Sequence, residues 1–220
     1  MTHRAKKGSK RWIQIAVNDK PAILDSAVLE SLNLPGRKKI QWSSPVKPGY
    51  REHRDLAALG VIEAPPLRVP LDSFWPRRGP VWDALGRTDH GDCLFVEAKA
   101  HIAEAASPRS KATQASYALI QKSLEQVRAR LAPRSHADWT GTFFQYANRL
   151  AHLWFYREKN RLPAHLVFVY FLNAREVEGP ERREEWEAAL ILLHAALGLG
   201  RRHSLGRYVH DVFIDVDALT

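Results

Sequence analysis

Cysteine is almost absent from this sequence, since Cys93 is the single one among 220 residues. One thiol cannot form an internal disulfide, so a disulfide-stapled fold is excluded and the composition fits the reducing cytoplasm. The ten histidines contain no pair with the H-x-x-x-H spacing, and there is no C-x-x-C pair. We therefore expect no zinc site of the common types.

Long hydrophobic runs are also missing. The longest one extends only from Leu166 to Leu172, whereas a helix that crosses a bilayer needs about 20 apolar residues. The basic stretch from Met1 to Arg11 is not followed by an apolar segment, so it does not have the pattern of a secretory signal. The sequence therefore predicts a cytoplasmic protein that does not span a membrane.

Acidic residues are in deficit. The chain has 33 lysines and arginines against 24 aspartates and glutamates, which gives a formal net charge of +9. Such a balance favours polyanionic partners, because lysine and arginine neutralise phosphates and release counterions. We expect a nucleic acid as the partner, although basic proteins also bind acidic proteins.

The chain length suits one domain with a single sizeable core. We predict a basic flexible arm over residues 1–11 and a single domain over residues 12–220. The periodicity predicts helices over 21–32, 50–59, 117–131, 138–157 and 181–197, and strands over 81–86, 92–100, 165–172 and 209–216. The segment 37–49, with its prolines and serines, has the composition of a loop. This order of elements predicts an α/β sheet with helices on its faces.

Two charged residues stand at the end of the otherwise apolar predicted strand 92–100. Side chains alternate along a strand, so Glu97 and Lys99 point to the same face. Burying them costs several kcal/mol unless they are paired or hold a metal. If the hairpin turns near residues 87–91 with an even register, Asp83 faces the same side. The sequence thus predicts that two carboxylates and one lysine converge.

Two converging carboxylates supply the hard oxygen ligands that Mg²⁺ or Mn²⁺ prefers, while water and phosphate take the remaining positions. The metal neutralises charge on a phosphoryl oxygen and acidifies a bound water. A nearby lysine positions that water or stabilises the transition state. The alternative is a structural ion pair at a strand end, with no chemistry.

With Asp83 fourteen positions before Glu97-Ala98-Lys99, the segment resembles the PD-(D/E)xK nuclease superfamily, which includes restriction endonucleases and Holliday-junction resolvases. The stretch 75–85 is similar to an uncharacterised bacterial branch of it. The resemblance implies a restriction-endonuclease-like mixed central sheet flanked by helices on both faces. It also implies that Asp83 and Glu97 are metal ligands and that Lys99 is the catalytic lysine.

The chain departs from the superfamily pattern at one position. Trp82 precedes Asp83, where the motif name implies proline, and Pro80 is three positions before the acid. Members of the superfamily often carry a further acid on the helix before the hairpin. Glu52 is the candidate for that catalytic position, and Asp55, one helical turn later, is the alternative.

Several polar residues outside this group are candidates for binding nucleic acid. The predicted helix 138–157 carries a polar stripe made of Gln145, Asn148, Arg149 and His152. Arg149 either faces the site and holds a phosphate or belongs to a solvated helix face, which is the more common case. Arg77 and Arg78 either follow a phosphate backbone or are solvated surface residues.

The sequence therefore leads to three functional hypotheses. The first is a metal-dependent phosphodiester hydrolase, a nuclease with DNA as the expected substrate and Mg²⁺ or Mn²⁺ as the cofactor. The second is a non-catalytic nucleic-acid-binding module that retains the nuclease fold. The third is a protein-interaction or assembly factor that uses the basic arm, which predicts no metal binding and no dependence on Asp83.

Overall fold

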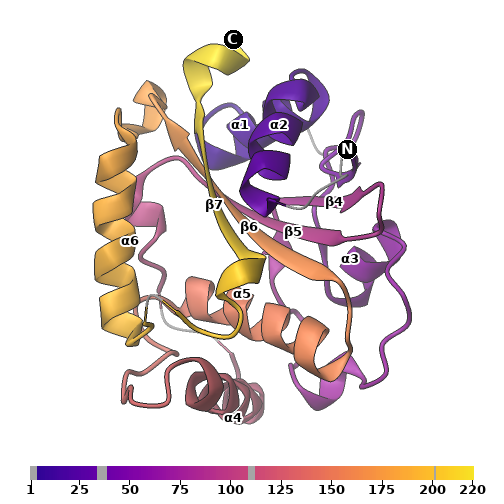
Figure 1. The fold of residues 1–220 in the computed structure, drawn as a ribbon, viewed down its shortest axis with the longest axis vertical. Helices are drawn as coiled ribbons and strands as arrows, with labels where there is room; N and C mark the ends of the chain where they lie inside the picture. The colour runs from indigo at the N-terminus through magenta and orange to yellow at the C-terminus, as the bar shows by residue number, and fades with distance from the viewer. Residues whose placement is uncertain (1–3, 34–38, 109–111, 201) are drawn as a thin grey trace.

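A five-stranded mixed sheet runs through the centre of the computed structural model, which describes residues 4–33, 39–108, 112–200 and 202–220 (Figure 1). In spatial order its strands are β1 (Ile40–Ser44), β4 (Ala84–Thr88), β5 (Cys93–Lys99), β6 (Ala164–Leu172) and β7 (Val209–Asp215). β4 runs antiparallel to its neighbours β1 and β5, while β5, β6 and β7 are parallel. A second, two-stranded sheet pairs β2 (His53–Arg54) with β3 (Val81–Trp82).

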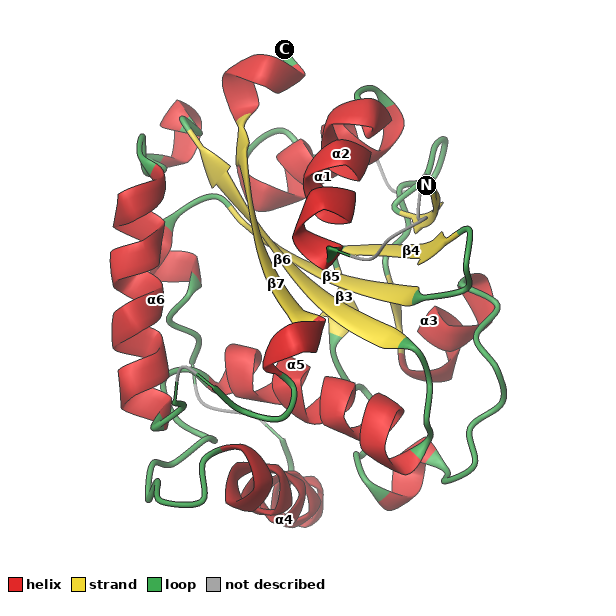
Figure 2. Ribbon diagram, viewed as in Figure 1, coloured by secondary structure: helices red, strands yellow, loops and turns green. Residues whose placement is uncertain are grey.

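Helices cover both faces of the main sheet, as the red and yellow elements of Figure 2 show. One face carries α1 (Gly8–Asn18) and α2 (Pro21–Leu32), and the other carries α3 (Asp55–Val61), α4 (Gln114–Leu131), α5 (Phe144–Trp154) and α6 (Arg183–Leu197). Short 3-10 turns lie at Leu71–Ser73, Ile102–Glu104, Arg175–Val177, Gly206–Tyr208 and Val216–Leu219, and a π-helical turn at Phe155–Lys159 continues α5. Within the described residues, no helix is both long and apolar enough to cross a membrane. The predicted α/β organisation is confirmed.

Strand alternation divides the core into two layers. Along β5, Cys93 and Phe95 belong to the cluster beneath α5, whereas Leu94 and Val96 belong to the cluster beneath α1 and α2. Strand β6 is buried along nearly its whole length between β5 and β7, as its apolar run predicted. By the same alternation, the next odd-numbered positions of β5 face α5.

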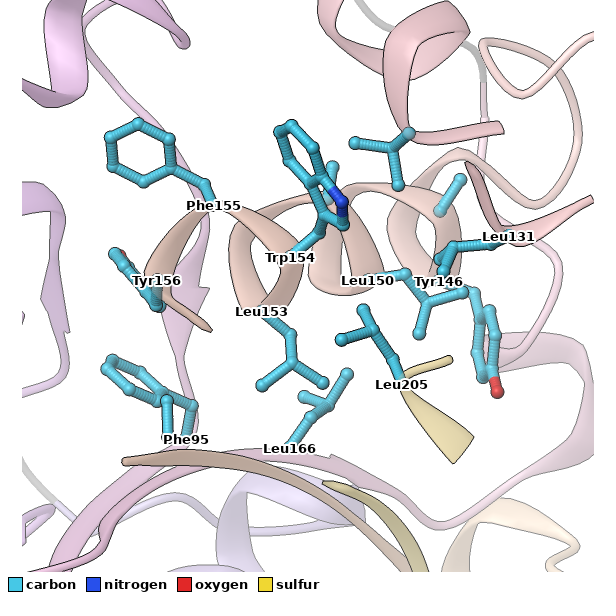
Figure 3. Packing of buried hydrophobic residues seen from close by; sticks show 14 of the residues in the cluster. Phe95, Leu131, Tyr146, Leu150, Leu153, Trp154, Phe155, Tyr156, Leu166 and Leu205 are labelled. Carbon is cyan, nitrogen blue, oxygen red and sulfur yellow. The ribbon is translucent and has the colours of Figure 1, made fainter. Parts of the chain in front are cut away.

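Helix α5 lies across the sheet and is buried on nearly all sides. Figure 3 shows Leu153 directed towards Phe95 and Leu166 of the sheet, while Trp154 points to the opposite side of the helix. Every residue from Tyr146 to Trp154 is buried. The polar residues of this helix are therefore held inside the protein, close to the strands.

The predicted loop over 37–49 is wrong in its described part, because β1 occupies Ile40–Ser44. This strand pairs with β4 along the sheet edge, and a Cβ at Gly86 would lie 2.9 Å from the ring of Trp42. Glycine therefore permits the close approach of the two strands. The strand is short and partly polar, so its local pattern did not distinguish it from a loop.

The predicted basic arm over residues 1–11 is also wrong in part. Residues 1–3 lie outside the described part of the chain, but α1 begins at Gly8 and packs Trp12 and Ile13 into the core. Arg4 pairs with Asp19 at 2.6 Å. The apolar residues of α1 anchor the helix on the sheet, so the basic residues before them are held near the protein surface.

Candidate active site

Glu97 and Lys99 lie at the carboxyl end of β5 and both face α5. Glu97 is 2% exposed to solvent and Lys99 is 8% exposed. Lys99 Nζ donates to Glu97 Oε1 at 2.5 Å. The prediction that these two residues share a face is confirmed. Both charges are thus buried and directly paired, as the cost of burying either one alone requires.

Asp83 lies at a break in the strand that leads into β4. Trp82 and Leu85 are three residues apart, yet both pack into the cluster beneath α5, so the regular alternation is interrupted at Asp83. Asp83 Oδ2 accepts a hydrogen bond from the backbone N–H of Ala98 at 2.8 Å. Ala84 is the residue paired with Val96, yet the Asp83 N–H also donates to the Val96 carbonyl at 3.0 Å. The charges of Glu97 and Lys99 both act on the Asp83 carboxyl, so the three groups lie near one another. The predicted hairpin is confirmed.

Two residues of α5 complete the group. Arg149 Nε donates to Glu97 Oε2 at 2.7 Å, and Nη2 lies 2.6 Å from the same oxygen while it donates to the Val81 carbonyl at 3.0 Å. Gln145 Oε1 accepts from Lys99 Nζ at 2.7 Å. Arg149 is only 4% exposed and lies over the Trp82 ring, with its guanidinium carbon 5.0 Å from the ring centroid.

The polar stripe on α5 is therefore not a solvated helix face. Arg149 and Gln145 were missed as members of the acid and lysine group, since the sequence predicted at most a phosphate contact for Arg149. A signal did exist, because several polar residues recur on a helix that is otherwise deeply apolar. Their partners on β5 are about fifty residues away in the chain, so local periodicity could not identify them.

The two carboxylates have opposite pKa shifts. Burial raises the pKa of Asp83 to about 7, and the nearby charge of Glu97 adds to this effect, although Lys99, the Ala98 N–H and Arg149 oppose it. Burial also acts to raise the pKa of Glu97, but Arg149 and Lys99 outweigh it and hold that pKa below its ordinary value. Glu97 is thus ionised at neutral pH, and Asp83 is poised between its two protonation states.

The donor set fits a hard divalent cation only in part. Two carboxylates, Asp83 and Glu97, are present, but the described residues contain no cluster of three or more His, Cys, Asp or Glu side chains. Water and a substrate oxygen would have to complete the coordination of Mg²⁺, as they do in many Mg²⁺ sites. Glu97 already accepts from Lys99 and Arg149, so a cation at this carboxylate competes with two bound cationic groups.

Glu52 and Asp55 occupy different places. Glu52 is not on a helix; it immediately precedes β2 and pairs with Lys10 Nζ at 2.9 Å. Because His53 pairs with Trp82, the next step of that ladder would set Glu52 opposite Asp83. Asp55 instead accepts from the backbone N–H groups of Gly79 at 2.8 Å and Arg78 at 3.2 Å, so it holds a loop.

Arg77 and Arg78 are exposed on the loop that Asp55 holds. They line a cavity of about 350 Å³ together with the start of α4 and with Asn148 of α5. Among the described residues, no identified contact joins either arginine to Asp83, Glu97 or Lys99. They lie beside the candidate active site and are separated from it by α5.

No known protein family, curated protein or solved structure matches the chain. The superfamily resemblance therefore depends on the residues themselves, and the function has to be argued from the geometry described above.

Proposed function

We propose that the chain is a metal-dependent nuclease that hydrolyses phosphodiester bonds, with DNA as the expected substrate, and that its sheet is of the restriction-endonuclease-like type. One observation carries the proposal. An acid on one strand of a hairpin and an acid–x–lysine on the next converge in a buried group at the end of the sheet. Burying ionisable groups costs free energy, and buried groups with shifted pKa values often belong to the active sites of enzymes.

In this mechanism Asp83 and Glu97 would hold Mg²⁺ or Mn²⁺, which would supply polarisation of the phosphate and a more acidic water. Lys99 has three N–H donors, two of which are used by Glu97 and Gln145 among the described residues. Its third donor is left for an incoming water or phosphate oxygen. Arg149 and Gln145 fix the positions of Glu97 and Lys99, so the charged groups need little rearrangement during the reaction.

The charges of the site support binding of metal and substrate together. When Asp83 is ionised, the two carboxylates balance Lys99 and Arg149, so the group is formally neutral. A divalent cation adds two positive charges to a buried place, which is unfavourable by itself. A phosphodiester brings a negative charge that would offset part of this cost. We therefore expect tight metal binding only when nucleic acid is present.

One observation favours the second hypothesis, a non-catalytic module that retains the fold. Both oxygens of Glu97 are already engaged, one by Lys99 and one by Arg149. A fully paired carboxylate is also what a structural ion-pair network would contain. Asp83 is different: its buried carboxyl is in no ion pair found among the described residues, so the nuclease remains the better proposal.

The test is cleavage of a mixed panel of supercoiled, linear, branched and single-stranded DNA and RNA, with Mg²⁺ or Mn²⁺, by wild type and Lys99→Ala. Loss of the lysine should lower the rate on the order of 10²-fold or more and leave binding largely intact. Lys122→Ala, which removes an exposed lysine from α4, is the matched control. If wild type binds nucleic acid but cuts nothing, the binding-module hypothesis replaces the nuclease.

A further inference from the structure

A cavity of about 350 Å³ adjoins the candidate active site on the other side of α5. The loop 75–79 forms one wall, and the first turn of α4 forms another, where Thr113 and Ser116 present hydroxyl groups. Phe144 and Asn148 of α5 close it. No acidic side chain is among the described residues that line it, and its charged residues are Arg77 and Arg78, which also line a neighbouring cavity of about 770 Å³ with Asp55 and Asp72.

The arginine-bearing loop is held in place before any ligand binds. Asp55 accepts from the backbone of Arg78 and Gly79, and Arg78 has a left-handed backbone with φ +72°. A Cβ at position 79 would lie 2.4 Å from Asp55 Oδ1, so only glycine fits this approach. The carboxylate thus binds the loop backbone and leaves both exposed guanidinium groups directed to their surroundings.

The first turn of α4 has the properties of an anion site. The helix is 18 residues long, has no acidic residue in its first turn, and Thr113 makes no side-chain capping bond. Thr113 Oγ1 donates instead to Ser116 Oγ at 3.2 Å. The N–H groups at the start of a helix have no intrahelical acceptor, and the helix dipole favours negative charge there.

Asn148 supplies an independent observation. It is 7% exposed, it lines the cavity, and its Oδ1 is covered without a hydrogen-bond partner among the described residues. A buried carboxamide that lacks a partner costs about 1–3 kcal/mol. The Nδ2 donors of the same carboxamide are the atoms that a ligand oxygen in the cavity would engage, while Oδ1 needs a donor such as a water or a ligand hydroxyl.

The cavity lies within one helical turn of the candidate active site. Gln145, which holds Lys99, and Asn148 are three residues apart on α5, or about 4.5 Å along the helix axis. A strand whose reacting phosphate lies at Lys99 would pass this part of α5 on its way to the cavity.

We infer that this cavity binds a backbone phosphate of the nucleic acid through Arg77, Arg78, the first turn of α4 and Asn148. The inference rests on the proposed function, because it places the same strand in the nuclease site. It also deepens that proposal, since it names a second contact that sets the position of the strand without taking part in the reaction.

The experiment measures binding of fluorescein-labelled single-stranded and duplex DNA in EDTA, so that no cleavage occurs. Arg77→Ala/Arg78→Ala is compared with Arg130→Ala/Arg134→Ala, which removes the same charge from exposed positions at the other end of α4 and just beyond it. We expect the first pair to weaken binding by about tenfold or more and to lower the salt slope by about one. The control pair should change the affinity by no more than about twofold.

Asn148→Asp provides a second variant of nearly the same shape, whose negative charge should repel the phosphate and weaken binding; its folding is checked by the melting temperature. Equal losses for the two arginine pairs would mean that only net charge matters, and unchanged binding would mean that the cavity is not used; either result overturns the inference. The proposed function is tested apart from this, by cleavage and Lys99→Ala. Selective loss of binding by a protein that cuts nothing would keep the phosphate site and reject the nuclease.

Discussion

Arg149 of α5 and Glu97 of β5 form a buried ion pair, in which Nε donates to Oε2 at 2.7 Å and Nη2 lies 2.6 Å from the same oxygen. The pair joins the helix to the sheet and also binds the Val81 carbonyl, so it holds the strand that leads to Asp83. Removal of one partner of such a pair is expected to lower the stability of the fold, because the charge of the other partner stays buried.

We predict that Arg149→Met lowers the free energy of unfolding by about 3–5 kcal/mol, because Glu97 is left buried with Lys99 as its remaining cationic partner. Urea unfolding at pH 7 measures the change. Arg130→Met, at an exposed position of α4, is the control and should cost no more than about 0.5 kcal/mol. Similar costs for the two variants would show that the pair contributes little to the fold.

We predict that Asp83→Asn is more stable than wild type above pH 7 and nearly equal to it at about pH 4. The folded pKa of Asp83, about 7, is raised above its ordinary value of 3.8, so the native state holds a proton that the unfolded chain has lost. Wild type therefore loses stability as the pH rises from about 4 to 7, and asparagine removes this loss. Melting temperatures across this range test it, and parallel curves for the two proteins would contradict it.

Glu97 should show the opposite dependence. Arg149 and Lys99 lower its folded pKa, so its contribution to stability is present above its ordinary pKa and is lost as the pH falls through the lowered value. Glu97→Gln should therefore differ most from wild type at neutral pH and least in strong acid. A difference that grows towards acid would exclude the ion-pair explanation.

Metal binding should release a proton from Asp83. Below pH 7 this carboxyl is largely protonated, and a cation must displace the proton before it can bind. We predict that the apparent affinity for Mg²⁺, measured with uncleaved nucleic acid present, rises with pH up to about 7 and then levels off. Calorimetry in two buffers of different ionisation enthalpy measures the number of protons released on metal binding. Binding without proton release at pH 6 would place the metal elsewhere.

Glu52 and Asp55 should behave differently when they are changed. Glu52 directly precedes β2, whose His53 pairs with Trp82, the neighbour of Asp83, so Glu52→Gln should weaken metal binding by about 10-fold or more as a supporting acid. Asp55 holds the backbone of Arg78 and Gly79, so Asp55→Ala should weaken DNA binding in EDTA and leave the metal affinity unchanged. The reverse pattern would make Asp55 the acid of the site.

Much of the fold was predictable because its signals are local. The apolar run over β6 indicated a strand buried on both faces, and the bounds of α2 agree with the prediction. β1 was not predictable, because a short edge strand with polar residues owes its place to pairing with β4 rather than to its own pattern. The start of α1 was missed for a similar reason, since packing on the sheet stabilises it.

By itself, the sequence determined that Glu97 and Lys99 share a face and that Asp83 precedes them on a hairpin, because strand alternation and turn position depend on neighbouring residues. Only the tertiary structure decided that Arg149 and Gln145 contact these groups, that Asp83 lies at a break in its strand, and that Arg77, Arg78 and Asn148 line one cavity. Those contacts join segments far apart in the chain. They arise from the packing of α5 against the sheet, which no local pattern of residues specifies.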